Sequence, residues 1–123
     1  MKYISISILS ALVLLLAYSG CYYDKEATLY PNAVCDSTNV TYSLKIAPII
    51  QEHCLSCHAQ SSSLGGGVVL EGYDNLKSYA NGGLLVGTIS YAIGFTAMPA
   101  SGKMSDCNIA LIKKWVDAGA PNN

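Results

Sequence analysis

The apolar residues near the N-terminus form a nearly continuous run, whereas those farther along the chain recur at helical spacing. The run extends from Ile4 to Ala17, is interrupted only by serines and follows Lys2. A positive residue before an apolar run of this length is typical of a signal peptide, and the run is too short to span a membrane. Residues 1–20 are therefore predicted to be a processing segment rather than part of the fold.

Beyond residue 40 the spacing of apolar residues predicts three helices. The first is expected from about Ala47 into residues 54–58, and Pro48 is compatible with it because proline is tolerated in the first helical turn. The second is expected over residues 74–81, where it ends at a pair of glycines. Between these two helices, residues 61–67 are rich in serine and glycine and are expected to form a flexible loop.

The last helix has the clearest signals at its ends. Ser105 is expected to cap its N-terminus, and Gly119 and Pro121 are expected to stop it. Trp115 is expected to be a core anchor against the first helix, because buried aromatic side chains usually serve packing. The apolar residues of this helix fall on one face: Ile109, Ile112, Trp115 and Val116.

Composition and charge limit the organisation and the kinds of partner. Residues 21–40 show no clear period and are predicted to be a tether and N-terminal extension, and residues 41–123 are predicted to be one domain. The chain has seven lysines, no arginine and eight acidic residues, which gives a net charge of −1. Nucleic-acid binding, which requires clustered positive charge, is not expected.

The sequence Cys-Leu-Ser-Cys-His at residues 54–58 is the strongest chemical signal. Two thiols three positions apart, followed at once by a histidine, are the attachment signature of c-type haem. Cys54 and Cys57 are predicted to bond the porphyrin, and His58 is predicted to be the proximal ligand of the iron. The apolar cluster at residues 68–70 is expected to pack against that haem rather than to form a strand, because no partner strand is evident.

Two other interpretations of the cysteine pair remain open. A thioredoxin-like dithiol should open a helix inside a βαβ pattern, and no such pattern is visible. A structural zinc site needs four ligands, usually from a second pair, and the remaining cysteines are scattered singly. The histidine directly after the second thiol favours haem over both.

Cys21 follows small residues at the end of the apolar run, as in the lipobox of bacterial lipoproteins. We predict that the signal is cut before Cys21 and that this cysteine is lipidated. Tyr18, three residues earlier, is atypical for that position, where leucine is usual. The alternative is an ordinary cleaved signal that leaves Cys21 as a spare thiol.

Export leads to a prediction for the two remaining cysteines. Haem of the c type is attached outside the cytoplasm, where disulfides also persist. With Cys21, Cys54 and Cys57 assigned, Cys35 and Cys107 are left to form one disulfide if the fold brings them together. Such a bridge would pin the N-terminal extension to the last helix. The alternative is a pair of free thiols.

The second axial ligand of the iron is predicted from a short set of candidates. His53 precedes Cys54 and lies on the same side of the ring as His58, so it is excluded. Met98, which is followed by a proline in a loop, is preferred to Met104, which abuts the cap of the last helix and is expected to fill the core. If neither methionine coordinated, the iron would be five-coordinate and open to small ligands.

These features together resemble the small monohaem cytochrome c family. The resemblance covers about residues 41–121 and rests on Ile46-Ala47-Pro48-Ile49-Ile50, the 54–58 motif, Met98-Pro99, Ile112-Lys113-Lys114-Trp115-Val116 and Gly119-Ala120-Pro121. It implies an all-α, cytochrome c-like fold in which the N- and C-terminal helices cross and haem lies between helices and long loops.

The expected function is one-electron transfer between redox donor and acceptor proteins, with His/Met ligation and no substrate transformed. The protein is expected to be exported and lipid-anchored to a bacterial membrane, facing the periplasm or the cell surface. The lysine ring by which some soluble cytochromes c dock is missing, so a small and partly apolar interface is expected. The alternatives are a haem peroxidase or small-ligand sensor with an open sixth site, and an electron-transfer subunit of a larger oxidoreductase complex.

Overall fold

The structure is a computed structural model, and it describes residues 35–123. The predicted signal peptide at residues 1–20, the lipidation site Cys21 and residues 22–34 of the tether lie outside the described residues. The compact unit runs from Cys35 to Asn123. It therefore includes the last six residues of the segment predicted as tether and extension. No helix in this part of the chain is long and apolar enough to cross a membrane.

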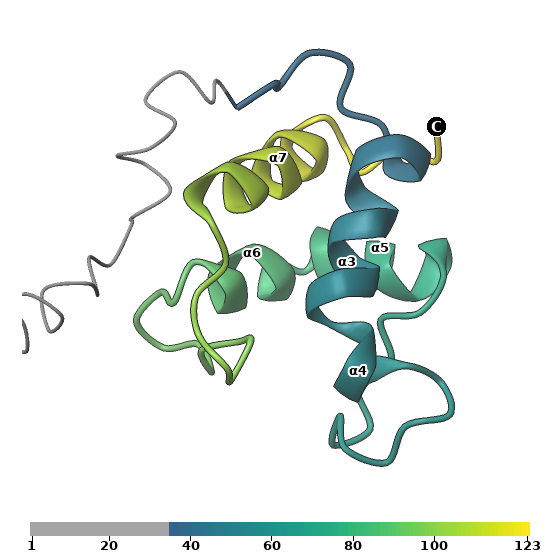
Figure 1. The fold of residues 1–123 in the computed structure, drawn as a ribbon, viewed down its shortest axis with the longest axis vertical. Coiled ribbons are helices and arrows are strands. Elements are labelled where there is room, and N and C mark those ends of the chain that lie inside the picture. Colours follow the sequence, from purple (N-terminus) through teal and green to yellow (C-terminus); the bar gives the residue numbers. More distant parts are fainter. Residues whose placement is uncertain (1–34) are drawn as a thin grey trace, which may run out of the picture. The chain divides into compact units, whose positions relative to one another are not determined.

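Within the described residues the secondary structure is entirely helical, which confirms the predicted all-α class (Figure 1). Two long loops separate the helices, one after α4 and one between α6 and α7. Residues 68–70, which were expected not to form a strand, lie in the first of these loops. In chain order the elements are η1 (Tyr42–Ile46), α3 (Ala47–His53), α4 (Leu55–His58), α5 (Tyr73–Asn81), α6 (Leu84–Ile89) and α7 (Asp106–Asp117).

The first helical segment begins earlier than its sequence predicts. Pro48 lies in the first turn of α3, as expected, but the backbone before it is already helical because η1 runs directly into α3. The wider π-type turn of η1 is capped by Thr41, whose side-chain oxygen accepts a hydrogen bond from the amide of Leu44 at 3.3 Å. Proline has no N–H to bond back one turn, so the sequence rule places a helix start there. The structure instead extends the helix through a turn of different spacing.

The core is built from apolar side chains of all the longer helical segments, with α7 in contact with η1 and α6. Trp115, Ile112 and Ile46 have no exposed surface, and Leu76 of α5 is 1% exposed. The ring of Trp115 lies 5.9 Å from that of Tyr42 in η1, measured between centroids, so Trp115 packs against the first helical segment as predicted. Figure 1 shows α7 running across the axis of η1 and α3.

The C-terminal residues are tied back to this core. The φ angle of Gly119 is +87°, a left-handed conformation that glycine adopts without strain, and α7 ends there as predicted. Three side chains then hold the tail: the Trp115 indole N–H donates to the carbonyl of Pro121 at 2.9 Å, the Tyr73 hydroxyl donates to that of Ala120 at 2.8 Å, and the Asn123 side chain accepts from the amide of Tyr42 at 2.8 Å.

The helix α6 was not predicted. The glycine pair at residues 82–83 correctly marks the end of α5, but Gly83, at φ +72°, also serves as the N-cap of the next helix. Gly87 further lowers the helix propensity of this segment. It is needed there because a Cβ atom at residue 87 would lie 2.5 Å from ring carbons of Phe95. The helix was missed because Gly83 is used for its positive φ at the cap and Gly87 for its lack of a side chain, and both glycines weaken the helical signal.

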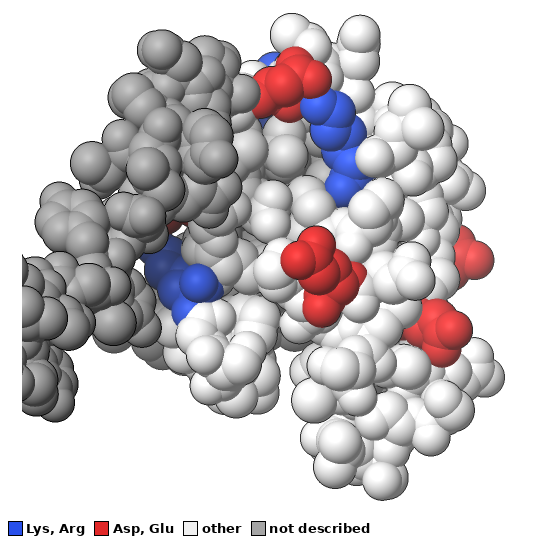
Figure 2. All heavy atoms as spheres, in the orientation of Figure 1, with Lys and Arg blue, Asp and Glu red and all other residues white. Residues whose placement is uncertain are grey.

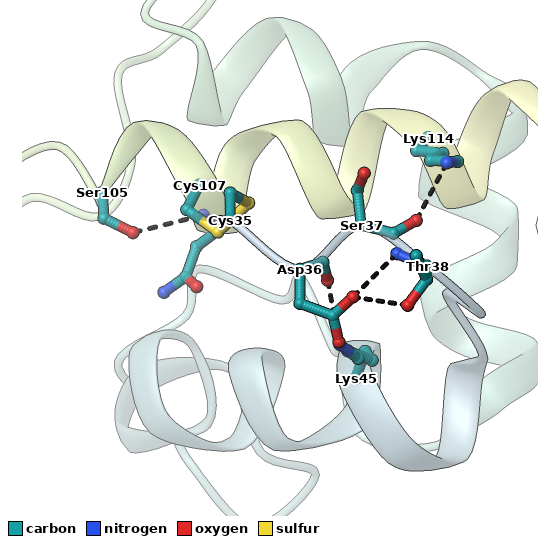
Figure 3. Close-up of a disulfide and its surroundings, with 9 residues drawn as sticks. Cys35, Asp36, Ser37, Thr38, Lys45, Ser105, Cys107 and Lys114 are labelled. Atoms are coloured by element: carbon teal, nitrogen blue, oxygen red, sulfur yellow. Dashed lines mark hydrogen bonds and ion pairs between the residues drawn. A yellow bond between two sulfur atoms is a disulfide. The ribbon is translucent and has the colours of Figure 1, made fainter. Parts of the chain in front are cut away.

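The start of the compact unit is pinned to two helices (Figure 3). Cys35 and Cys107 form a disulfide, as predicted, with their sulfur atoms 2.01 Å apart. Lys45 forms an ion pair with Asp36, and its ammonium group holds the pKa of that carboxyl well below the ordinary value. Lys114 of α7 donates to the carbonyl of Ser37 at 2.9 Å. The extension is therefore fixed to η1 and α7 at three successive residues.

Removal of the disulfide is expected to lower the stability of the domain. The bridge joins residues 72 positions apart, and closing a loop of that length should contribute about 4 kcal/mol by restricting the unfolded chain. The double variant C35S/C107S should therefore unfold at a lower denaturant concentration than the oxidised protein. Denaturant titration followed by far-UV circular dichroism measures the difference.

The control is the wild-type chain with this bond reduced, which should reproduce the midpoint of the variant. An unchanged midpoint in the variant would show that the two lysine contacts already hold the extension without help from the disulfide.

Candidate cofactor site

The predicted haem-attachment motif lies at the junction of α3 and α4. Cys54 connects the two helices, and the carbonyl of Cys54 accepts hydrogen bonds from the amides of Cys57 at 3.2 Å and His58 at 2.9 Å. A single tight turn therefore holds the two thiols and the imidazole together. Both cysteines are free, Cys54 being buried and Cys57 exposed. Burial raises the pKa of the Cys54 thiol to about 11.

The imidazole of His58 is oriented by a backbone carbonyl. Its Nδ1 atom lies 2.9 Å from the carbonyl oxygen of Val68. Because a carbonyl only accepts, Nδ1 must carry the proton and donate it. In the neutral ring the lone pair is then on Nε2, the nitrogen that is left to coordinate a metal ion. His58 therefore has the tautomer that an axial iron ligand requires.

The loop that follows α4 encloses His58. The amide of Leu70 donates to the His58 carbonyl at 2.9 Å, and the amide of Val68 donates to the carbonyl of Gly65 at 3.0 Å. A Cβ atom at residue 65 would lie 2.6 Å from the Cys57 carbonyl oxygen and 2.7 Å from Nδ1 of His58. Only glycine fits this position. The segment was predicted as a flexible loop, but at Gly65 its backbone packs closely against Cys57 and His58.

Met98 and Met104 lie in different surroundings, and the prediction that Met104 fills the core is confirmed. Met98 is half-buried in the segment between α6 and α7, and its amide donates to the carbonyl of Thr88 at 3.3 Å. Met104 is 6% exposed and belongs to the core. His53, which was excluded as a ligand, contacts α7, where its Nε2 atom lies 3.1 Å from the side-chain amide nitrogen of Asn108.

The two segments that carry the predicted ligands flank a notch. Figure 2 shows this notch between two lobes, one formed by α4 and the loop after it, and the other by the segment after α6. An acidic side chain shows where the first lobe joins the rest of the molecule and a lysine where the second lobe does, whereas the outer parts of both lobes show neither. Residues 53–70 and 78–102 contain no lysine, aspartate or glutamate, but Glu71 and Lys103 follow them directly, and the Glu71 carboxylate accepts a hydrogen bond from the Gln60 amide at 2.8 Å. Large apolar side chains are exposed on these segments: Leu64, Leu84, Tyr91, Ile93 and Phe95.

The donor groups match the requirements of a c-type haem. The turn at residues 54–58 offers two free thiols and an imidazole whose Nε2 lone pair is available, and Met98 offers a thioether on the other lobe. The backbone contributions of Val68 and Gly65 were missed by sequence analysis. A glycine run after the motif was the only signal, and it did not distinguish a loop that packs against His58 from a flexible loop. Residues 35–123 contain no cluster of three or more histidine, cysteine or acidic side chains arranged to hold a metal ion.

Comparisons with protein families, with curated proteins and with solved structures found no match to this chain. The interpretation of the site therefore rests on its own residues.

The two thiols of the haem-free chain are expected to differ in reactivity. At pH 8 a thiol with a pKa of about 11 has about 100-fold less thiolate than one with an ordinary pKa of 9.0, and the thiolate is the reactive form. Iodoacetamide should therefore alkylate exposed Cys57 rapidly and buried Cys54 slowly. Mass spectrometry of peptides taken at successive times measures both rates.

The denatured chain is the reference, because unfolding should raise the rate at Cys54 to that of an ordinary thiol. Equal alkylation of both cysteines in native buffer would contradict the buried position of Cys54.

Proposed function

We propose that this chain is a monohaem c-type cytochrome that carries single electrons between redox proteins. The observation that supports this best is the hydrogen bond from His58 Nδ1 to the Val68 carbonyl, next to two free thiols on the same turn. This hydrogen bond leaves the Nε2 lone pair free to coordinate a metal ion. The motif at residues 54–58 independently predicts covalent haem. A dithiol redox site would have no use for an imidazole fixed in this way.

The residues divide the work of binding the cofactor. Cys54 and Cys57 would hold the porphyrin through thioether bonds, His58 would bind the iron through Nε2, and Met98 would bind it through its sulfur. Haem would supply the one-electron chemistry when bound. The chain would supply the two ligands that leave no position on the iron open to a substrate. A thioether ligand raises the reduction potential relative to a second imidazole.

The low charge of the face around the notch supports a weak and transient mode of docking. Electrostatic steering requires complementary charge near the contact, and the two flanking segments carry only Glu71 and Lys103, one at the end of each. Redox encounters generally use small interfaces that dissociate quickly. We propose donor and acceptor proteins with a contact surface of similarly low charge, met by a carrier that is lipid-anchored through Cys21 and faces the periplasm or the cell surface.

The closest alternative is a haem peroxidase or small-ligand sensor, in which the sixth position is open. The two roles differ at Met98, because a carrier keeps this ligand bound in both oxidation states whereas a sensor or peroxidase exchanges it. Its place in a hydrogen-bonded, half-buried segment favours the carrier. Whether the chain is a free carrier or a subunit of a larger complex can be tested by purification from gently solubilised membranes.

Replacement of Met98 tests this function directly. In natively matured protein, the ferric wild type should show the charge-transfer band of a methionine–iron bond at about 695 nm. The M98L variant should lose this band, bind carbon monoxide strongly in the ferrous state and have a lower reduction potential, because the thioether is gone while the side-chain volume is nearly kept. Visible spectra and a redox titration measure these changes.

The matched control is M104L, which makes the same substitution at a core position. It should keep the band and the potential of the wild type. Persistence of the band in M98L, or its loss in M104L instead, would overturn the assignment of Met98. A colourless wild type from a host with working haem-attachment machinery would overturn the proposed function.

A further inference from the structure

The segment that carries Met98 is held to α6 by contacts on both sides of the methionine. Before it, the carbonyl of Thr88 accepts a hydrogen bond from the Met98 amide at 3.3 Å. The same carbonyl also accepts from the amide of Tyr91 at 3.3 Å. After it, the Tyr91 hydroxyl donates to the carbonyl of Pro99 at 2.6 Å. Tyr91 thus contacts the chain at the end of α6 and again one residue beyond Met98.

The backbone of Tyr91 is itself unusual. Its φ angle is +56°, in the left-handed region that a bulky side chain rarely adopts. A residue held in such a conformation persists when the surrounding contacts fix it, and these positions concentrate at functional sites. Here the left-handed turn directs the tyrosine ring back across the segment to reach Pro99.

A third contact packs the segment between α6 and Met98 against α6. The ring of Phe95 lies so close to Gly87 that a Cβ atom at residue 87 would be 2.5 Å from it. The amide of Ala92 donates to the Gly87 carbonyl at 3.0 Å, and that of Phe95 donates to the Ala92 carbonyl at 3.1 Å. The segment that precedes Met98 is therefore anchored to the last turn of α6, at Gly87 and Thr88.

From these contacts we infer that Tyr91 is a positioning residue that holds Met98 in place as a ligand. The inference rests on the proposed function and extends it to the retention of the sixth ligand. All of these contacts are made by backbone groups and by Tyr91 and Phe95, so none of them uses the methionine sulfur, and the segment is held whether or not that sulfur is bound. A ligand on an ordered segment loses less conformational freedom on binding, and it competes better against an external ligand.

The test is competition between Met98 and imidazole for the iron of the ferric, natively matured protein. Y91F removes the hydroxyl that donates to the Pro99 carbonyl and leaves the ring in place. Because a typical hydrogen bond makes a modest net contribution, imidazole should bind Y91F about 5-fold more tightly than wild type. The band at about 695 nm should disappear at correspondingly lower imidazole concentrations.

The control is Y73F, which makes the same substitution away from the methionine segment. It removes a hydrogen bond from a tyrosine hydroxyl to the Ala120 carbonyl at 2.8 Å, together with one that this hydroxyl accepts from Lys77 at 2.8 Å. It should lower global stability without changing imidazole affinity. Equal imidazole affinity in Y91F and Y73F would show that Tyr91 has only a structural role, and would overturn the inference while the proposed function stands. A wild type without the methionine band would overturn the proposed ligation before any variant is compared.

A second variant reaches the same segment through a different contact. In G87A the added methyl group must displace the Phe95 ring, so imidazole should again bind more tightly than in wild type. This variant decides the question if Y91F does not yield folded protein. If G87A bound imidazole with wild-type affinity, the order of the segment could not be what keeps Met98 bound.

Discussion

Trp115 and Ile112 of α7 are fully buried against Ile46 of η1, and both lobes of the molecule depend on this contact. A domain of this size buries a smaller fraction of its surface than a larger domain does, so a few large side chains carry much of its stability. The helix α7 contacts η1 on one side and α6 on the other. Because η1 continues into α3 and then into α4, one helix sets the position of both segments that flank the notch.

The parts that sequence predicted correctly are those with strong local signals. The helix α7 has a side chain that caps it, an apolar face at helical spacing and a glycine that ends it, so all three signals agree with the tertiary structure. The pairing of Cys35 with Cys107 followed from counting the thiols of a chain predicted to be exported, and the fold brings the two sulfurs together. The core position of Met104 followed from its place beside the cap of the last helix, and its burial agrees with it, whereas the role of Met98 as a ligand stays a prediction.

The parts that sequence did not predict depend on backbone groups or on glycine. The carbonyl that orients His58 belongs to Val68, ten residues away. Every residue has a backbone carbonyl, so the side-chain pattern cannot indicate which one accepts a hydrogen bond. Gly65 and Gly87 are required by close approaches of other atoms, yet in sequence they are indistinguishable from glycines that make a loop flexible. The helix α6 and the loop that packs against His58 were missed for this one reason.

Both proposed ligands are positioned through backbone carbonyls, and this has a consequence for how the site works. The carbonyl of Val68 orients the imidazole of His58, and the carbonyls of Thr88 and Pro99 fix the segment of Met98. A carbonyl brings no charge and does not titrate, so neither ligand depends on an ionisable neighbour for its position. Charged contacts hold the extension to α7 and η1 (Figure 3), and the nearest ones to the two ligand segments are made by Glu71 and Lys103 at their ends. The hydrogen bonds that fix His58 and the Met98 segment are therefore separate from the ionic contacts, and the positions of these residues should depend little on pH or ionic strength.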